Sequence, residues 1–294
     1  MSVKERIAQE LSLGDVVTKT FELYRRDFSK YLILFIIVEV ITGLINTVIH
    51  SAIVMPKLAA NPTAQQFFNW VPGFLGALIS IVALSAIITL ILYPIAYGGA
   101  IKIASDVVEK GQADIEASVR FAISRILWLW LVGIVVGIIV SLGLVALIVP
   151  GIILAIMFSL VPPVLIIEKP SFESLRRSRK LVGDRWLKTL AVFIVFGIII
   201  AIAAAIAGAI SAVFGVASTI VSSILSAFYL PLIPIALTVY YYSNVVRITP
   251  PQMGPPPTTP VALTQTGVRF CPNCGTKIDT ATIFCPSCGA KQPS

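Results

Sequence analysis

The chain has 294 residues, of which 57% are hydrophobic and 12% are charged, and its formal net charge at pH 7 is +8. Soluble domains contain about 25% charged residues, so this composition excludes an ordinary soluble protein and predicts an integral membrane protein. Most basic residues lie beside apolar stretches, where they orient helices and contact anionic lipid. The placement of the basic residues therefore predicts that the partners of the protein include membrane lipids and do not include nucleic acid.

The first 30 residues form a polar entry with six Lys or Arg residues, more charge than the short leader of a cleaved signal peptide carries. Within it Val17, Thr20 and Tyr24 recur at helical spacing, with basic residues between them. This pattern predicts an amphipathic helix at the membrane interface. Ser12 and Asp15 match the S-x-x-D signal that begins a helix.

The first predicted crossing covers about 31–54 and contains an ionisable residue, Glu39. Glu39 follows Lys30 by about nine residues, or about 13 Å of helix, which places it near the middle of the membrane. A carboxyl group at that depth is costly and marks a proton relay, an ion ligand or a partner of another helix. The alternative is a structural glutamate, neutral or hydrogen-bonded, that faces the bundle interior. A polar loop follows, and the second crossing is expected over about 71–100.

The stretch between Arg125 and Glu168 has no charged residue and is long enough for the third and fourth crossings. Pro150-Gly151 is expected to supply the break between them, since proline cannot continue a helix and glycine accepts unusual dihedral angles. Gly133 and Gly137 form a G-x-x-x-G pattern, which predicts close helix packing. Upstream, Asp114 is placed to cap a helix.

A basic helix is predicted after Ser171, with Arg176, Arg177, Arg179 and Lys180 on one side. From Lys188 to Arg247 the chain is again free of charge, which predicts a fifth and a sixth crossing with a turn near 214–215. Ala204, Gly208 and Ala212 give small-x-x-x-small spacing in the fifth crossing, a second packing signal.

These segments predict an all-α membrane fold of six transmembrane helices, arranged as three hairpins, each preceded by an interfacial amphipathic helix. The second crossing of each hairpin carries proline toward its inner end, at Pro94, at 162–163 and at 231–234. Basic residues fill the entry and the loops at 102–125 and 169–188, whereas the opposite side has only Lys57. The positive-inside rule therefore predicts a multi-pass protein of the cell membrane with both termini in the cytoplasm.

The three predicted domains are a membrane domain (1–247), a proline-rich linker (248–268) and a small metal module (269–290). The module has C-x2-C-x10-C-x2-C spacing, and its four thiolates predict a closed, tetrahedral Zn²⁺ site. Such a short segment has almost no core, so the metal must supply most of its folding energy. A redox dithiol or an iron centre of rubredoxin type remains an alternative. The ligands are Cys271, Cys274, Cys285 and Cys288.

One stretch of the membrane region resembles a known family. It reads VPGIILAIMFSLVPPVLIIEKPSFESLRRSRKLVGDRW, with a Pro-Gly turn, a crossing, an acidic exit and a basic helix ending in Trp186. This order is similar to the membrane domains that are sometimes fused to glycerophosphoryl diester phosphodiesterases, and to stand-alone bacterial and archaeal membrane proteins with a terminal zinc ribbon. The resemblance covers about residues 10–247. It does not imply phosphodiesterase activity, because that activity needs several histidines and acidic metal ligands on a soluble barrel, and this chain has one histidine.

Three classes of function fit these features. The first is a non-enzymatic membrane scaffold or regulator whose cytoplasmic ribbon binds a soluble protein. The second is a small-molecule permease that uses Glu39 and the proline-kinked helices. The third, an intramembrane enzyme, is not expected, because the apolar segments hold no set of catalytic polar groups at matching depth.

Overall fold

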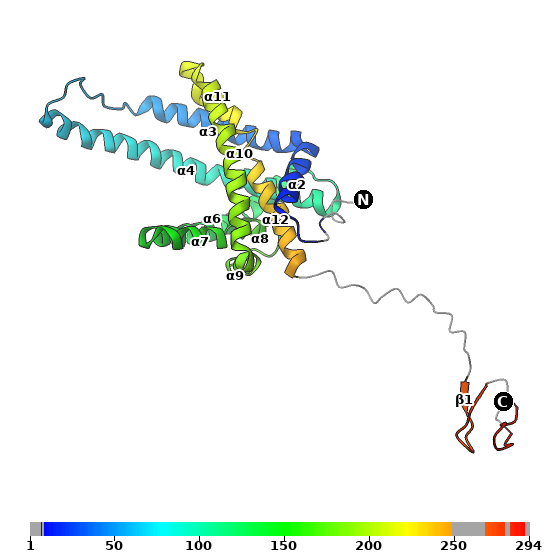
Figure 1. The fold of residues 1–294 in the computed structure, drawn as a ribbon. Helices are drawn as coiled ribbons and strands as arrows, with labels where there is room; N and C mark the ends of the chain where they lie inside the picture. Colours follow the sequence, from blue (N-terminus) through cyan, green and yellow to red (C-terminus); the bar gives the residue numbers. More distant parts are fainter. Residues whose placement is uncertain (1–6, 8, 249–267, 280–282, 292–294) are drawn as a thin grey trace. The chain divides into compact units, whose positions relative to one another are not determined.

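The structure is a computed structural model that describes residues 7, 9–248, 268–279 and 283–291. The chain divides into two compact units, Met1–Pro250 and Pro251–Ser294, which are described separately. The predicted linker (248–268) lies almost wholly outside the described residues. Figure 1 gives the order of the elements.

The regular secondary structure described in the first unit is all helical, as predicted. Its α-helices are α2 (Leu13–Arg26), α3 (Phe28–Ala52), α4 (Ala64–Lys110), α5 (Ile115–Ser124), α6 (Ile126–Ala146), α7 (Ile148–Met157), α8 (Val161–Ile167), α9 (Glu173–Val182), α10 (Trp186–Ala212), α11 (Ser218–Ser226) and α12 (Leu232–Ile248). Two short 3₁₀-helices, Gly183–Arg185 and Gly215–Ala217, precede α10 and α11.

Five stretches of the described chain are long and apolar enough to cross a membrane, which makes this a multi-pass membrane protein. They are Phe28–Ala52, Ala64–Lys110, Ile126–Ala146, Ile148–Ile167 and Glu173–Ala212. The region expected to form a sixth crossing is divided instead into α11, which has 9 residues, and α12, which has 17, and the chain between them contains Pro231. Proline has no N–H to continue the helical hydrogen bonds, which accounts for the break.

The helix starts predicted at Ser12 with Asp15 and at Asp114 are confirmed, whereas α9, predicted to be capped at Ser171, begins at Glu173 without a side-chain cap. Ser12 and Asp15 form a reciprocal capping box before α2, because the Ser12 hydroxyl accepts from the Asp15 N–H and the Asp15 carboxylate accepts from the Ser12 N–H. Asp114 caps α5, accepting from the Ala117 N–H at 2.7 Å. These local signals fix where the short helices begin.

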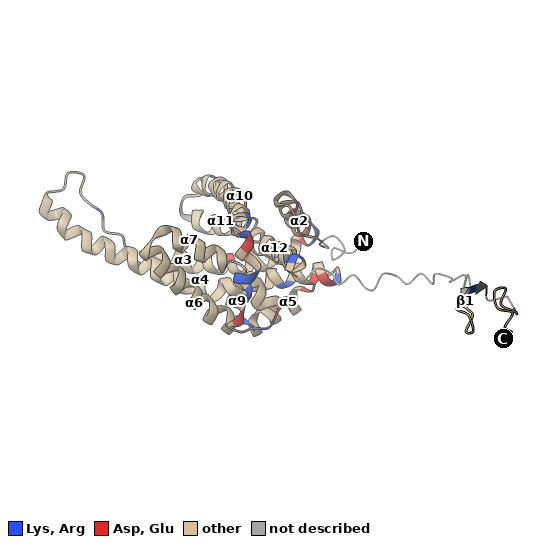
Figure 2. Ribbon diagram, turned by 60° about the horizontal axis from the view of Figure 1, so that its bottom comes forward, with Lys and Arg blue, Asp and Glu red and all other residues tan. Residues whose placement is uncertain are grey.

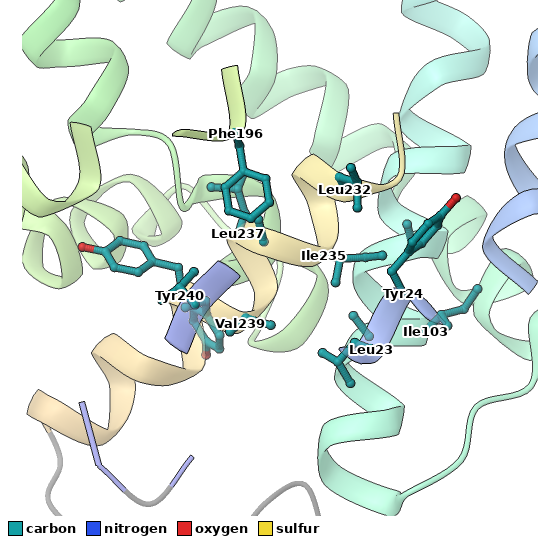
Figure 3. Close-up of a cluster of buried hydrophobic side chains, with 14 of the residues drawn as sticks. Leu23, Tyr24, Ile103, Phe196, Leu232, Ile235, Leu237, Val239 and Tyr240 are labelled. Carbon is teal, nitrogen blue, oxygen red and sulfur yellow. The ribbon is translucent and has the colours of Figure 1, made fainter. Parts of the chain in front are cut away.

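The core of the membrane unit is built around α12. Eleven of its 17 residues are buried, and it packs against α2, α4, α8 and α9. Figure 3 shows Ile235 and Val239 of α12 beside Leu23 of α2 and Ile103 of α4. The amphipathic helix α2 was expected to lay its apolar face on lipid, but this face packs against protein. Most of the exposed apolar surface of the unit lies instead on the long helices.

The break between α6 and α7 lies at Leu147, and not at Pro150-Gly151 as predicted. Pro150 lies in the first turn of α7, where its missing N–H costs nothing. Gly151 has a different role: a Cβ there would lie 2.6 Å from the backbone nitrogen of Leu144 in α6. Gly151 therefore allows the backbones of α6 and α7 to approach closely.

The other glycine patterns do not pack as expected. A Cβ built on Gly133, Gly137 or Gly208 would meet no described atom within 4 Å. The close contacts in the unit involve different glycines: a Cβ on Gly43 of α3 would lie 2.5 Å from the Ser223 hydroxyl oxygen of α11. The G-x-x-x-G spacing alone did not identify the packed faces.

The long helices do not share a single direction. In Figures 1 and 2, α3, α4 and α6 extend to the same side of the unit, whereas α10 runs across them. Charged residues in Figure 2 gather at the end of the unit that carries α2, α5 and α9. Within α4, charge begins only at Lys102.

The second unit contains a two-stranded antiparallel sheet of β1 (Val268–Phe270) and β2 (Lys277–Asp279), with Arg269 opposite Ile278. A single bridge joins Phe284 and Lys291. This small framework carries the four cysteines.

Candidate metal centre and the buried glutamate

Each Cys-x-x-Cys pair forms the same tight turn. In the first turn the Cys271 N–H donates to the Thr276 carbonyl (2.9 Å), and the Gly275 N–H donates back to Cys271 (2.8 Å). The second turn, 285–290, repeats both bonds at 3.0 and 2.9 Å. Gly275 and Gly289 have φ angles of 72° and 71°, which favour glycine at these positions. The two turns present their thiols to a common point.

The sulfur positions fit a tetrahedral zinc site. All four Sγ atoms lie within 4.8 Å of one another. Cys271 Sγ lies 3.7 Å from Cys288 Sγ, and Cys274 Sγ lies 3.6 Å from Cys285 Sγ. A Zn–S bond of about 2.3 Å in a tetrahedron requires sulfurs about 3.8 Å apart. The donor set and its spacing therefore match Zn²⁺, as the sequence predicts.

Neighbouring side chains support the thiolates. Thr276 Oγ1 lies 3.3 Å from Cys274 Sγ, and the Asn273 amide donates to Cys288 Sγ at 3.8 Å. The hydroxyl and the backbone of Thr276 lower the pKa of Cys274. A lower pKa favours the thiolate, which is the form that binds metal.

The site is closed. Four thiolates complete the coordination that Zn²⁺ takes in structural sites and leave no position for water or substrate. Within the described ranges, these cysteines are the only group of three or more His, Cys, Asp or Glu residues arranged to hold a metal. The zinc therefore stabilises the fold of the ribbon, and no hydrolytic chemistry is assigned to it.

The ribbon also exposes three large apolar side chains that sequence reasoning missed. Phe270 is 69% exposed, Ile283 is 65% exposed and Phe284 is 59% exposed. Phe270 and Phe284 each directly precede the first cysteine of a turn. This repeated Phe-Cys-Pro is the sequence signal that could have identified them. A module with so little core cannot bury them itself.

Glu39 lies in α3 and is half-buried within the helical unit. Its Oε2 atom lies 2.8 Å from the hydroxyl of Ser226, the last residue of α11. The same hydroxyl lies 2.6 Å from the Ser223 carbonyl. The Ser226 hydroxyl is the donor in both contacts, so the Glu39 carboxyl group and the Ser223 carbonyl share its proton. Glu39 lies outside the walls of four cavities described in the unit.

Two charged groups join distant parts of the chain. Glu168 Oε1 accepts from Arg177 Nε at 2.9 Å and from the Tyr241 hydroxyl at 2.7 Å, which ties the loop after α8 to α9 and α12. Glu10 binds Lys188 (2.6 Å) and Arg185 (3.2 Å) beside α10. The hydrogen bond from Lys188 lowers the pKa of Glu10. Sequence reasoning missed the pairings of Glu10 with Lys188 and of Glu168 with Tyr241, because these partners lie 178 and 73 positions apart in the chain.

Comparison with known proteins identifies the second unit. Residues 270–292 match the zinc-ribbon domain family. No curated protein and no solved structure matches the chain. The chain is therefore a multi-pass membrane protein whose C-terminal segment is similar to zinc-ribbon domains.

Proposed function

We propose that this chain is a non-enzymatic membrane scaffold or regulator that presents its zinc ribbon to a soluble protein. The observation that carries the proposal is the combination of a closed four-cysteine site with exposed Phe270 and Phe284 on the same small unit. A zinc ion without an open position serves structure, and aromatic side chains are enriched at protein interfaces. The ribbon has the features of a docking module.

The charge of the ribbon favours a protein partner over nucleic acid. Its charged residues are Arg269, Lys277 and Lys291 against Asp279. Binding to nucleic acid at physiological salt depends on neutralising several phosphates, and three basic residues are few for that.

We also propose a topology for the membrane unit. Six crossings pair as three hairpins, α3 with α4, α6 with α7–α8, and α10 with α11–α12, and both termini lie in the cytoplasm of a cell membrane. Consecutive packing of α3 on α4, of α6 on α7 and of α10 on α11 supports this pairing. The asymmetry of basic residues supports the orientation. We propose in addition that the membrane unit is related to the membrane domains associated with glycerophosphoryl diester phosphodiesterases.

Site-specific photocrosslinking of the full-length chain in its native membranes tests the docking function. A photoreactive amino acid at position 283, between the two aromatic residues in the ribbon, is expected to give a discrete protein adduct. Phe270→Ser with Phe284→Ser is expected to remove the adduct, whereas Ser287→Ala, an exposed polar site in the same ribbon, is expected to retain it. Zinc content must stay the same in all variants. An adduct of equal yield in the double variant would refute docking through the aromatic residues.

A further inference from the structure

A cavity of ≈ 680 Å³ lies where a candidate span gives way to the basic helix. Its walls come from the end of α8, the loop that follows, and the first two turns of α9. Val164 and Ile167 are its apolar lining residues, and the other lining residues are polar or charged. The span Ile148–Ile167 ends at this cavity, so it lies at the level where lipid headgroups meet the hydrocarbon core.

The cavity has an excess of positive charge. Four cations and two carboxylates line it: Lys169, Arg176, Arg177, Lys180, Glu168 and Glu173. Glu168 is already engaged, since it accepts from Arg177 and from Tyr241. Over the described ranges, Lys169, Arg176 and Lys180 have no ion-pair partner within 4.0 Å. Four cations against two carboxylates leave the cavity with a net positive charge, which favours an anionic ligand.

Two further groups in the wall need a partner. Ser174 is 2% exposed, and its hydroxyl has no hydrogen-bond partner among the described residues. The N-terminus of α9 has no side-chain cap, unlike those of α2 and α5, so its positive end also faces this region uncapped. Buried hydroxyls are normally hydrogen-bonded, and an uncapped helix N-terminus is suited to an anion.

The surroundings of the cavity favour a lipid as the source of the anion. Phe172, in the loop between α8 and α9, is 52% exposed, and its ring packs edge-on against Trp128 of α6 with centroids 5.6 Å apart. Aromatic rings of this kind are enriched at the headgroup level of membranes. Basic pockets between helices at the membrane surface are known settings for anionic headgroups.

We propose that the cavity between α8 and α9 binds the phosphate group of an anionic phospholipid. Arg176, Arg177 and Lys180 supply the positive charge, Glu168 holds Arg177 in position, and Val164 with Ile167 contacts the start of the acyl chains. The site does not involve the ribbon, and it is independent of the docking function proposed above.

Binding of fluorescent phosphatidylglycerol to the full-length, detergent-solubilised protein tests the site. Arg176→Gln is expected to weaken binding about fivefold, the effect of one basic residue close to an anionic lipid surface. Arg179→Gln removes the same charge from the same helix at an exposed position outside the cavity, and it is expected to leave binding unchanged. Equal losses in the two variants would show attraction by the basic surface alone and would overturn the proposal.

Competition identifies the source of the phosphate. Unlabelled phosphatidylglycerol is expected to displace the probe, whereas phosphatidylcholine, glycerol 3-phosphate and inorganic phosphate at the same concentration are not. Displacement by either soluble phosphate would overturn the lipid assignment. Thermal unfolding of each variant establishes that the variant is folded.

Ser174→Ala provides an independent test inside the cavity. Without added lipid, the variant is expected to be at least as stable as the parent, because the hydroxyl it removes has no partner. Its affinity for phosphatidylglycerol is expected to fall. Unchanged affinity in both Ser174→Ala and Arg176→Gln would refute the site.

Discussion

At the scale of single residues, variants of Glu39 distinguish a structural role for this side chain from a role in transport. Its contact with Ser226 joins α3 to α11, and it lies outside the walls of four cavities in the unit. We expect Glu39→Gln, which keeps a hydrogen-bonding group of the same shape, to preserve the unfolding temperature. Glu39→Leu should lower stability by about 1–3 kcal/mol, because it leaves the Ser226 hydroxyl with one partner fewer.

Proton transport, the competing role of Glu39, is tested by measuring the internal pH of proteoliposomes that contain the protein. If the chain were a proton-coupled permease, Glu39→Gln would abolish proton movement while leaving stability intact. Retention of full stability in Glu39→Leu would contradict the structural role.

Glu10 gives the first unit a dependence on pH. Its pKa is lowered from 4.5 by Lys188 and then by Arg185, so ionised Glu10 stabilises the attachment of the N-terminal segment to α10. A carboxyl group whose pKa falls on folding contributes stability above its unfolded pKa and loses it as pH falls through its folded pKa. We therefore expect residues 9–15 to exchange amide hydrogens faster below about pH 4.5, after correction for intrinsic rates.

The matched variants are Glu10→Gln and Glu116→Gln. Glu10→Gln should raise exchange of residues 9–15 at pH 7 by up to about fivefold, the effect of an ion pair worth about 1 kcal/mol. Glu116 pairs with Arg120 on the exposed face of α5, far along the chain from Glu10, so its variant should leave that exchange unchanged. A pH-independent difference between Glu10→Gln and the parent would contradict the assignment.

At the scale of helices, Gly151 holds α6 and α7 together. A Cβ there would meet the Leu144 side chain at 2.5 Å and the Leu144 backbone nitrogen at 2.6 Å, and a backbone atom cannot move aside by changing rotamer. We expect Gly151→Ala to lower the free energy of unfolding by about 1–3 kcal/mol, the cost of overpacking.

Gly133→Ala is the control, because a Cβ there meets no described atom within 4 Å. Alanine is favoured over glycine inside a helix, so this change should be neutral or stabilising by up to about 1 kcal/mol. Denaturant unfolding in detergent measures both. The reverse order of stabilities would show that the G-x-x-x-G face, and not Gly151, is the packed one.

We expect the ribbon to require zinc for its folding, independently of the helical unit. Apparent zinc-binding free energies of about 10–16 kcal/mol are typical of such modules, far more than a two-stranded sheet supplies. Cys271→Ser, or a strong chelator, is expected to make the ribbon sensitive to protease, while the helical circular dichroism of the whole chain changes little. A ribbon that stays protease-resistant in a chelator would refute its dependence on the metal.

At the scale of the whole molecule, labelling of single cysteines tests the topology. In a variant without the four ribbon cysteines, Arg120→Cys is expected to react only from the cytoplasmic side. Val54→Cys and Val213→Cys, both 84% exposed, should react only from the opposite side. The position at 213 is the most informative, because α10 runs across α3 and α4 in Figure 1. Cytoplasmic labelling at 213 would remove the third hairpin from the proposed topology.

Sequence reasoning succeeded where one short stretch determines the structure. The capping residues Ser12 and Asp114 satisfy backbone groups three positions away, and the four cysteines lie within one short segment at metal-ligand spacing. These features depend on local spacing, so the sequence alone was sufficient to predict them.

It failed where the outcome depends on how separate helices pack against one another. The apolar face of α2 could pack on lipid or on protein, and only the position of α12 decides between them. In the same way, Gly151 suits a turn as well as a close contact, and Leu144 determines which it makes. The cation-lined cavity combines the end of α8 with α9 and cannot be read from either helix alone.

The length of α4 has a consequence for the surrounding bilayer. The helix is continuous over 47 residues, or about 70 Å, although the hydrocarbon core of a membrane is about 30 Å thick. Its uncharged part, up to Ile101, is itself about 57 Å long. A stretch that exceeds the bilayer this far accommodates the mismatch by tilting, by bending at Pro72 or Pro94, or by thickening the lipid around it. Because the last third of α4 packs in the same core as α12, a change in membrane thickness that alters the tilt of α4 would strain this core directly.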